Sequence, residues 1–187
     1  MSIPTTYAEW IASFDNFKTG TQDEEVLTSM EKGSIEWTKG VAERLTQHLF
    51  ETIEFRLKHT ANQLQKELNA CRGNETALVK AILSARKRLA VLKRVAHLPA
   101  FPDHVKEAMN TLLHDYAKST QQSLEDSALT DRTGRLRSLI RHNPITEFDK
   151  VENVFGSSIS TSKHKNTTVG NIPIVGQNPS RRRVILP

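Results

Sequence analysis

Apolar residues recur every three or four positions along most of the first 144 residues, which is the spacing of one helix face. The longest such stretch, residues 21–72, contains no proline. Thr21 and Glu24 have the spacing of a capping box at its start, and Gly73 is suited to the left-handed conformation that ends a helix. The stretch therefore predicts either one helix of about 75 Å or two helices nearly end to end, with the weak point near Gly33.

The apolar stripe in the middle of this stretch advances in steps of four residues. Each step exceeds the 3.6 residues of a helical turn, so the stripe rotates by about 40° per step around the helix. Phe50 and Phe55 widen it further. A rotating stripe favours contact with two or more partner helices over a two-stranded coiled coil. Its members are Val41, Leu45, Leu49, Ile53, Leu57 and Ala61.

Four further segments have helical patterns: residues 5–16, 75–97, 103–125 and 134–142. Asn74 and Asp103 are suited to cap the second and third of these. The second has a strict heptad seam formed by Leu78, Ile82, Ala85, Leu89, Leu92 and Ala96. The third repeats the pattern at Val105, Met109, Leu112, Tyr116 and Leu124. Short connections between similar helices favour antiparallel neighbours, so we expect an all-α, elongated antiparallel bundle built on one long helix.

Three parts of the chain follow from these patterns. Residues 1–20 form an amphipathic helix and a turn, which either folds back on the bundle or docks on another chain. Residues 21–144 form the helical bundle. Residues 145–187 are expected to form a flexible basic tail, because residues 156–170 are small, polar and aperiodic.

The formal net charge of +5 is unevenly distributed. Residues 1–50 hold four Lys and Arg against eight acidic residues, whereas residues 51–100 hold ten against four. This asymmetry predicts a basic surface that faces nucleic acid or an acidic protein. Aromatic residues suited to stacking on bases are absent from the basic segments. The candidate contacts are Lys80, Arg86, Lys87, Arg88, Lys93, Arg94, Arg135, Arg137 and Arg141.

The C-terminal tail contains two small apolar clusters in a polar segment, the second of them preceded by three arginines. A short apolar and basic motif on a flexible tether is typical of a docking peptide, which adds a strand to a sheet edge or fills a groove. The candidate partner-binding residues of the tail are Ile172, Ile174, Val175, Arg181, Arg182, Arg183, Val184, Ile185 and Leu186.

The sequence offers no constellation for catalysis or metal binding. It contains no Glu-x-x-His, His-x-x-x-His or His-Glu-x-x-His pattern, and Cys71 is its single cysteine. We therefore expect a protein that is not an enzyme and uses no metal or cofactor. One cysteine, no secretory signal and no apolar run long enough for a membrane span point to the cytoplasm.

These observations favour a non-enzymatic interaction, assembly or adaptor protein that docks through its bundle surface and its tail. The expected partner is another protein, either a different chain or a second copy of this one. The alternative is a nucleic-acid-binding protein that uses the basic helices at residues 75–97 and 132–142. No small-molecule substrate is evident.

Overall fold

The computed structural model describes residues 2–20, 22–71, 73–131 and 133–151. Within these ranges the chain is all-α: it contains six α-helices, two short 3-10 helices and no strand. None of the described helices has an uninterrupted apolar stretch that would let it cross a membrane. The elements are α1 (Tyr7–Thr19), α2 (Asp23–Glu31), α3 (Lys39–Cys71), α4 (Glu75–Ala96), α5 (Asp103–Ser127), η1 (Ala128–Thr130), α6 (Arg135–His142) and η2 (Ile145–Lys150).

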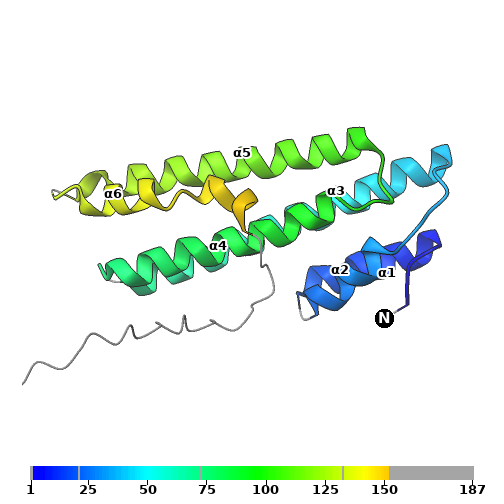
Figure 1. Ribbon diagram of the computed structural model, residues 1–187, viewed down its shortest axis with the longest axis horizontal. Coiled ribbons are helices and arrows are strands. Elements are labelled where there is room, and N and C mark those ends of the chain that lie inside the picture. The colour runs from blue at the N-terminus through cyan, green and yellow to red at the C-terminus, as the bar shows by residue number, and fades with distance from the viewer. Residues whose placement is uncertain (1, 21, 72, 132, 152–187) are drawn as a thin grey trace, which may run out of the picture. The chain divides into compact units, whose positions relative to one another are not determined.

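Helices α3, α4 and α5 pack antiparallel in chain order, and the shorter elements lie against them (Figure 1). Every residue of the heptad seam predicted for α4 is buried, which confirms the seam as a core face of the bundle. Gly73 ends α3 with a φ of 81°, and the Asn74 side chain caps α4 by accepting from the amide of Ala77, as expected. Asp103 does not cap α5 as expected, because the helix begins at Asp103 itself and Pro102 occupies the capping position.

The long stretch at residues 21–72 is not one helix, because α2 ends at Glu31 and α3 begins only at Lys39. At Gly33 the chain passes so close to α1 that a Cβ atom would lie 2.7 Å from the Trp10 ring. The Trp10 indole donates to the Ser34 carbonyl at 3.1 Å, and the Ser34 amide donates to the Pro4 carbonyl at 3.0 Å. Contacts with the N-terminal segment thus fix the break between α2 and α3, and only glycine, which has no Cβ, fits at position 33.

Helix α2 begins one residue later than the capping box expected at residues 21 and 24 requires. Gln22 occupies the capping position and makes no side-chain hydrogen bond to the helix, while Thr21 lies outside the described residues. A capping box does form at the start of α1, between Thr6 and Glu9. Hydrogen bonds from the amides of Thr5 and Thr6 lower the pKa of Glu9 to about 2.

Helix α1 folds back onto the bundle and packs against α3. Its Trp10, Phe14 and Phe17 side chains are fully buried, and the first two rings contact Phe101 from the loop before α5. Aromatic side chains bury more apolar area than other residues, so this corner is a large part of the core. The N-terminal helix therefore belongs to the same hydrophobic core as the rest of the bundle.

Two details of the predicted apolar stripes are wrong. In α3 the residue buried after Leu57 is Thr60, three positions on, so Ala61 at the step of four is exposed. Phe55, which was expected to widen the stripe, is 53% exposed. In α5 the fully buried leucine is Leu113, whereas Leu112 is half-buried. The pattern alone does not distinguish adjacent apolar positions, because the position of the neighbouring helix decides which of them faces the core.

The bundle continues past the boundary expected at residues 144 and 145. The 3-10 helix η2 packs on α4 and α5, and its Ile145 and Phe148 side chains have no exposed surface. Residues 145–150 are therefore part of the core, and the expectation that the tail begins at 145 is wrong. The tail residues proposed as a docking motif, Ile172 to Leu186, lie outside the described residues.

Candidate interaction surfaces

Most of the basic residues predicted to contact a partner form ion pairs with carboxylates of the same chain. Six of the nine do so, and their partners come from α2, α3, α4, α5 and η2. Arg86 and Lys93 hold η2, Arg88 pairs with Glu67 of α3, and Arg94 pairs with Glu31 of α2 at 2.6 Å. Two of the three arginines of α6 pair with neighbouring helices, Arg135 with Glu75 and Arg141 with Glu125.

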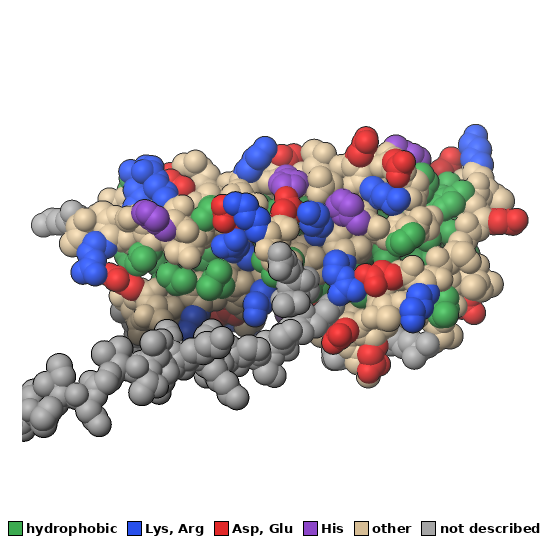
Figure 2. All heavy atoms as spheres, in the orientation of Figure 1, with side chains coloured by type: hydrophobic (Ala, Val, Ile, Leu, Met, Phe, Trp, Pro, Cys, Tyr) green, Lys and Arg blue, Asp and Glu red, His purple; other side chains and the backbone are tan. Residues whose placement is uncertain are grey.

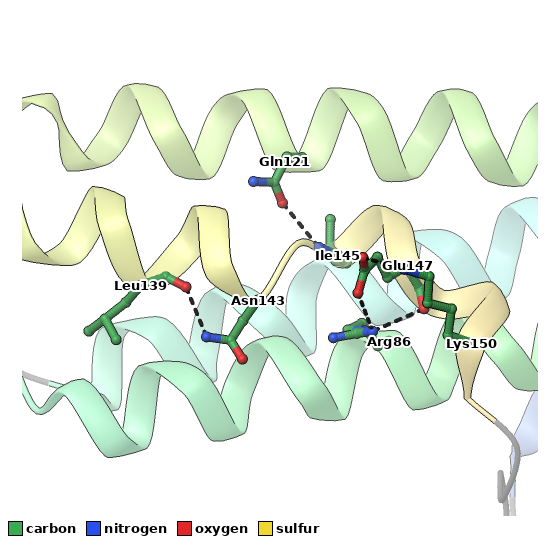
Figure 3. Close-up of polar contacts among 7 residues, drawn as sticks. All are labelled: Arg86, Gln121, Leu139, Asn143, Ile145, Glu147 and Lys150. Atoms are coloured by element: carbon green, nitrogen blue, oxygen red, sulfur yellow. Dashed lines mark hydrogen bonds and ion pairs between the residues drawn. The ribbon is translucent and has the colours of Figure 1, made fainter.

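Helix η2 is attached to α4 and α5 by polar contacts at both ends (Figure 3). The Gln121 side chain of α5 accepts from the Ile145 amide at 3.0 Å. The Arg86 guanidinium of α4 donates to the Glu147 carbonyl at 3.1 Å and to its carboxylate at 3.2 Å. Lys150 donates to the same carboxylate at 2.6 Å, so Glu147 is held by two cationic side chains.

Asp149 joins the same two helices at the end of η2. Its carboxylate lies 2.7 Å from the Lys93 ammonium of α4 and 3.2 Å from Nε2 of His114 in α5. The His114 ring also packs against Phe148, with 5.0 Å between the ring centroids. We call the α4–η2–α5 surface, with Arg86, Lys93, His114, Glu147 and Asp149, the ion-paired face.

Three of the predicted basic contacts make no ion pair within the described part of the chain: Lys80, Lys87 and Arg137. Lys80 and Lys87 are exposed on α4, whereas Arg137 is half-buried on α6. In Figure 2, the Lys and Arg side chains alternate with Asp and Glu side chains over the visible face and do not gather into one basic patch. The described surface is thus less basic than the distribution of charge along the sequence predicts.

A different surface lies between α3 and α5, where two adjoining hollows of about 230 and 220 Å³ share four lining residues. We call this the α3–α5 groove. None of the described residues that line it carries a charge. Its lining consists of Ala61, Leu64, Gln65, Leu68, Asn69, Leu78, Tyr116, Ser119, Thr120, Ser123, Leu124, Ser127, Ala128, Leu136 and Ile140.

Several hydroxyl groups of the groove are already satisfied by the backbone. Thr120 donates to the Tyr116 carbonyl at 2.8 Å, Ser127 to the Ser123 carbonyl at 2.7 Å, and Tyr116 to the Leu57 carbonyl at 3.3 Å. A hydroxyl that bonds its own helix in this way presents mainly carbon to its surroundings. The groove is therefore more apolar than its residue names suggest.

The sequence contained a signal for this groove that the search for charged and apolar motifs overlooked. Ser119, Ser123 and Ser127 recur every four residues on α5, and Ala61, Gln65 and Asn69 do the same on α3. Each row forms one ridge of uncharged side chains along its helix. The two ridges border a floor that includes Leu64, Leu68 and Leu124. Only the packing of α3 beside α5 brings the rows together.

Within the described residues, no group of three or more His, Cys, Asp or Glu side chains is placed to hold a metal ion. Cys71 is half-buried at the end of α3 and donates from its thiol to the Glu67 carbonyl at 3.1 Å. Comparison with known proteins found no matching family model, no matching curated protein and no matching solved structure. The groove and the ion-paired face are thus the surfaces from which function can be argued.

Proposed function

We propose that this protein is a non-enzymatic assembly or adaptor protein that binds another protein through the α3–α5 groove. The observation that carries the proposal is the absence of charge from the described lining of the groove, in a chain where 25% of residues are charged. An uncharged, largely apolar surface gains free energy when a partner removes it from water. Small-molecule chemistry would instead require reactive or charged groups in the hollow.

The dimensions of the groove favour a helix as its occupant. The lining residues on α5 extend from Tyr116 to Ser127, which at 1.5 Å per residue is about 17 Å, or roughly three helical turns. A helix satisfies its own backbone hydrogen bonds, whereas an extended peptide would need partners that these lining side chains do not supply. The expected partner helix has apolar side chains every three or four residues and no charge on the face that enters the groove.

The pairing of the basic residues supports protein binding over nucleic-acid binding. Affinity for phosphates depends on cationic side chains that are free to replace counterions. Here six of the nine candidate side chains already have carboxylate partners in the chain. The tail, which is also a candidate docking element, remains a sequence-based prediction.

Site-specific photocrosslinking in the cells that naturally make the protein tests the proposal. A photoreactive residue at Ser119, an exposed position on the groove, should form an adduct with a protein. The same residue at Lys87, which is exposed on α4, should not. Adducts at both positions, or adducts with nucleic acid alone, would contradict the proposal.

A groove variant provides the matched control. Ser123→Arg places a long charged side chain at an exposed position of the groove, so it should abolish the Ser119 adduct. Ser123→Ala keeps the position small and should leave the adduct unchanged. Because Ser123 is not part of the core, both variants should remain folded, which circular dichroism verifies.

A further inference from the structure

We infer that the partner is a second copy of this chain, which presents its own α3 and α5 in place of a single helix, so that two α3–α5 grooves face each other in a symmetric dimer. This inference rests on the proposed function. Since α4 runs antiparallel to both α3 and α5, those two helices run in the same direction. Each groove therefore presents two parallel helices, which form half of a four-helix bundle.

Charged residues of opposite sign lie on or just outside the two walls of the groove. On α3, Lys58 falls about 20° from both Gln65 and Asn69 around the helix axis, and Lys66 lies about 60° beyond Asn69. On α5, Asp126 and Asp115 fall about 20° and 40° outside Ser119. The wall formed by α3 thus carries Lys58 and Lys66 at its edge, and the wall formed by α5 carries Asp115 and Asp126, with Lys118 about 60° beyond Asp115.

None of these four side chains forms an ion pair within the described part of the chain. All four are exposed. They are Lys58, Lys66, Asp115 and Asp126. The Asp126 carboxylate accepts a hydrogen bond only from the neutral Gln122 side chain, at 2.8 Å. Such charges can pair with a partner that places acidic residues opposite α3 and basic residues opposite α5.

A second copy has that opposite arrangement. A two-fold axis parallel to the helices places α3 of one copy over α5 of the other. Because rotation does not change the height of a residue along the axis, residues at equal heights face each other. Tyr116 bonds the Leu57 carbonyl, so Asp115 lies near the level of Lys58. Lys66 is eight residues beyond Lys58, or about 12 Å along α3, and Asp126 is eleven residues beyond Asp115, or about 17 Å along α5, so the second pair differs in level by about 5 Å, which a lysine side chain can span. Each lysine would therefore face an aspartate of the partner, and by symmetry every contact occurs twice.

The other symmetric arrangement is unfavourable. A two-fold axis across the helices would place α3 over α3 of the partner, so Lys58 and Lys66 would face lysines. The small side chains at Ala61, Ser119 and Ser123 suit the first arrangement, because short ridges let helices approach closely. Leu64, Leu68 and Leu124 of both copies would then share one interior.

Sedimentation equilibrium on the purified chain, combined with a charge swap, tests this inference. The wild-type chain should be a dimer at micromolar concentration. Lys58→Glu or Asp115→Lys alone should raise the dimer Kd by about tenfold, because each converts two symmetric contacts into repulsion. The double variant should restore the wild-type Kd. Lys87→Glu makes the same charge change on α4 and should have no effect.

A monomer at all concentrations up to about 100 μM, or single reversals without effect on Kd, would overturn the inference. The Ser119 crosslink separates this failure from failure of the proposed function. An adduct with a different protein would keep groove binding and exclude the second copy as the partner. Absence of any protein adduct would contradict both the proposed function and the dimer. We expect an adduct between two copies of the chain.

Discussion

Helix α5 borders two surfaces of opposite character. On one side, His114 and Gln121 help to hold η2, and the charges there are neutralised within the chain. On the other side, the serines of the α3–α5 groove lie on a surface whose described lining is uncharged. The comparison shows that a high content of charge does not by itself locate a binding surface. Charges paired internally stabilise the fold, while the surface left without an internal partner is available for docking.

The largest expected effect comes from Phe148→Ala, which removes the buried aromatic side chain under the ion-paired face. Phe148 has no exposed surface, so the free energy of unfolding should fall by about 3–5 kcal/mol. Urea denaturation measures this loss. A change below about 1 kcal/mol would mean that η2 is not part of the core.

A pair of adjacent leucines on α5 tests the corrected register of its core face. Leu113→Ala should cost about 2–5 kcal/mol because Leu113 is fully buried. Leu112 is half-buried, and Leu112→Ala should cost less than about half as much. Equal losses in urea denaturation would argue against the register of α5 described above.

The Arg86–Glu147 contact tests whether the ion pairs of the ion-paired face act as pairs. Arg86→Met keeps most of the apolar stem but leaves Glu147 with Lys150 as its remaining cationic partner. The loss of stability should be smaller than for Leu113→Ala, since Glu147 is partly exposed. A double-mutant cycle with Glu147→Gln should give a favourable coupling energy. Additive effects would show that the two side chains do not interact in solution.

Lowering the pH should weaken the ion pairs of the ion-paired face, whereas the described lining of the groove has no charged side chain to protonate. The hydrogen bond from Lys150, together with the charges of Lys150 and Arg86, lowers the pKa of Glu147. Because this pKa is lower in the folded than in the unfolded chain, the ionised carboxylate stabilises the fold above the ordinary glutamate pKa of 4.5. This stabilisation is lost as the pH falls through the pKa of Glu147 in the folded protein. The stability difference between wild type and Glu147→Gln should therefore shrink between pH 7 and pH 3. A constant difference would contradict this assignment.

The smallest effect on stability is expected in the groove. Ser123→Ala should change the free energy of unfolding by less than about 0.5 kcal/mol, because Ser123 is exposed and its side chain makes no hydrogen bond within the described chain. Thermal unfolding measures the change. A large loss would show that the groove is a structural element of the monomer and not a docking surface.

Local signals in the sequence were sufficient for the helices and several of their ends. Gly73 and Asn74 mark the junction between α3 and α4, and the heptad seam of α4 is buried as its spacing predicts. These features depend on backbone preference and on periodicity within one segment, which do not change with the fold. The same local reasoning missed the capping box at Thr6 and Glu9, whose spacing is equally visible.

Contacts between distant segments decided the rest. The break after α2 needed Gly33 to lie against Trp10 and Pro4, which are 23 and 29 positions earlier, so the apolar pattern of α2 and α3 left two alternatives open. Residues 145–150 lack a helical pattern, yet Ile145 and Phe148 enter the core because α4 and α5 leave space for them.

The candidate site divides in the same way. The sequence by itself determined which residues are basic and that Ser119, Ser123 and Ser127 share one face of a helix. Only the tertiary structure decided that carboxylates from other elements neutralise the arginines of α4 and two of the three arginines of α6. It also decided that the serine face of α5 meets the Ala61 face of α3. Side-chain charge and helical spacing are local properties, whereas pairing and burial depend on which segments the fold brings together.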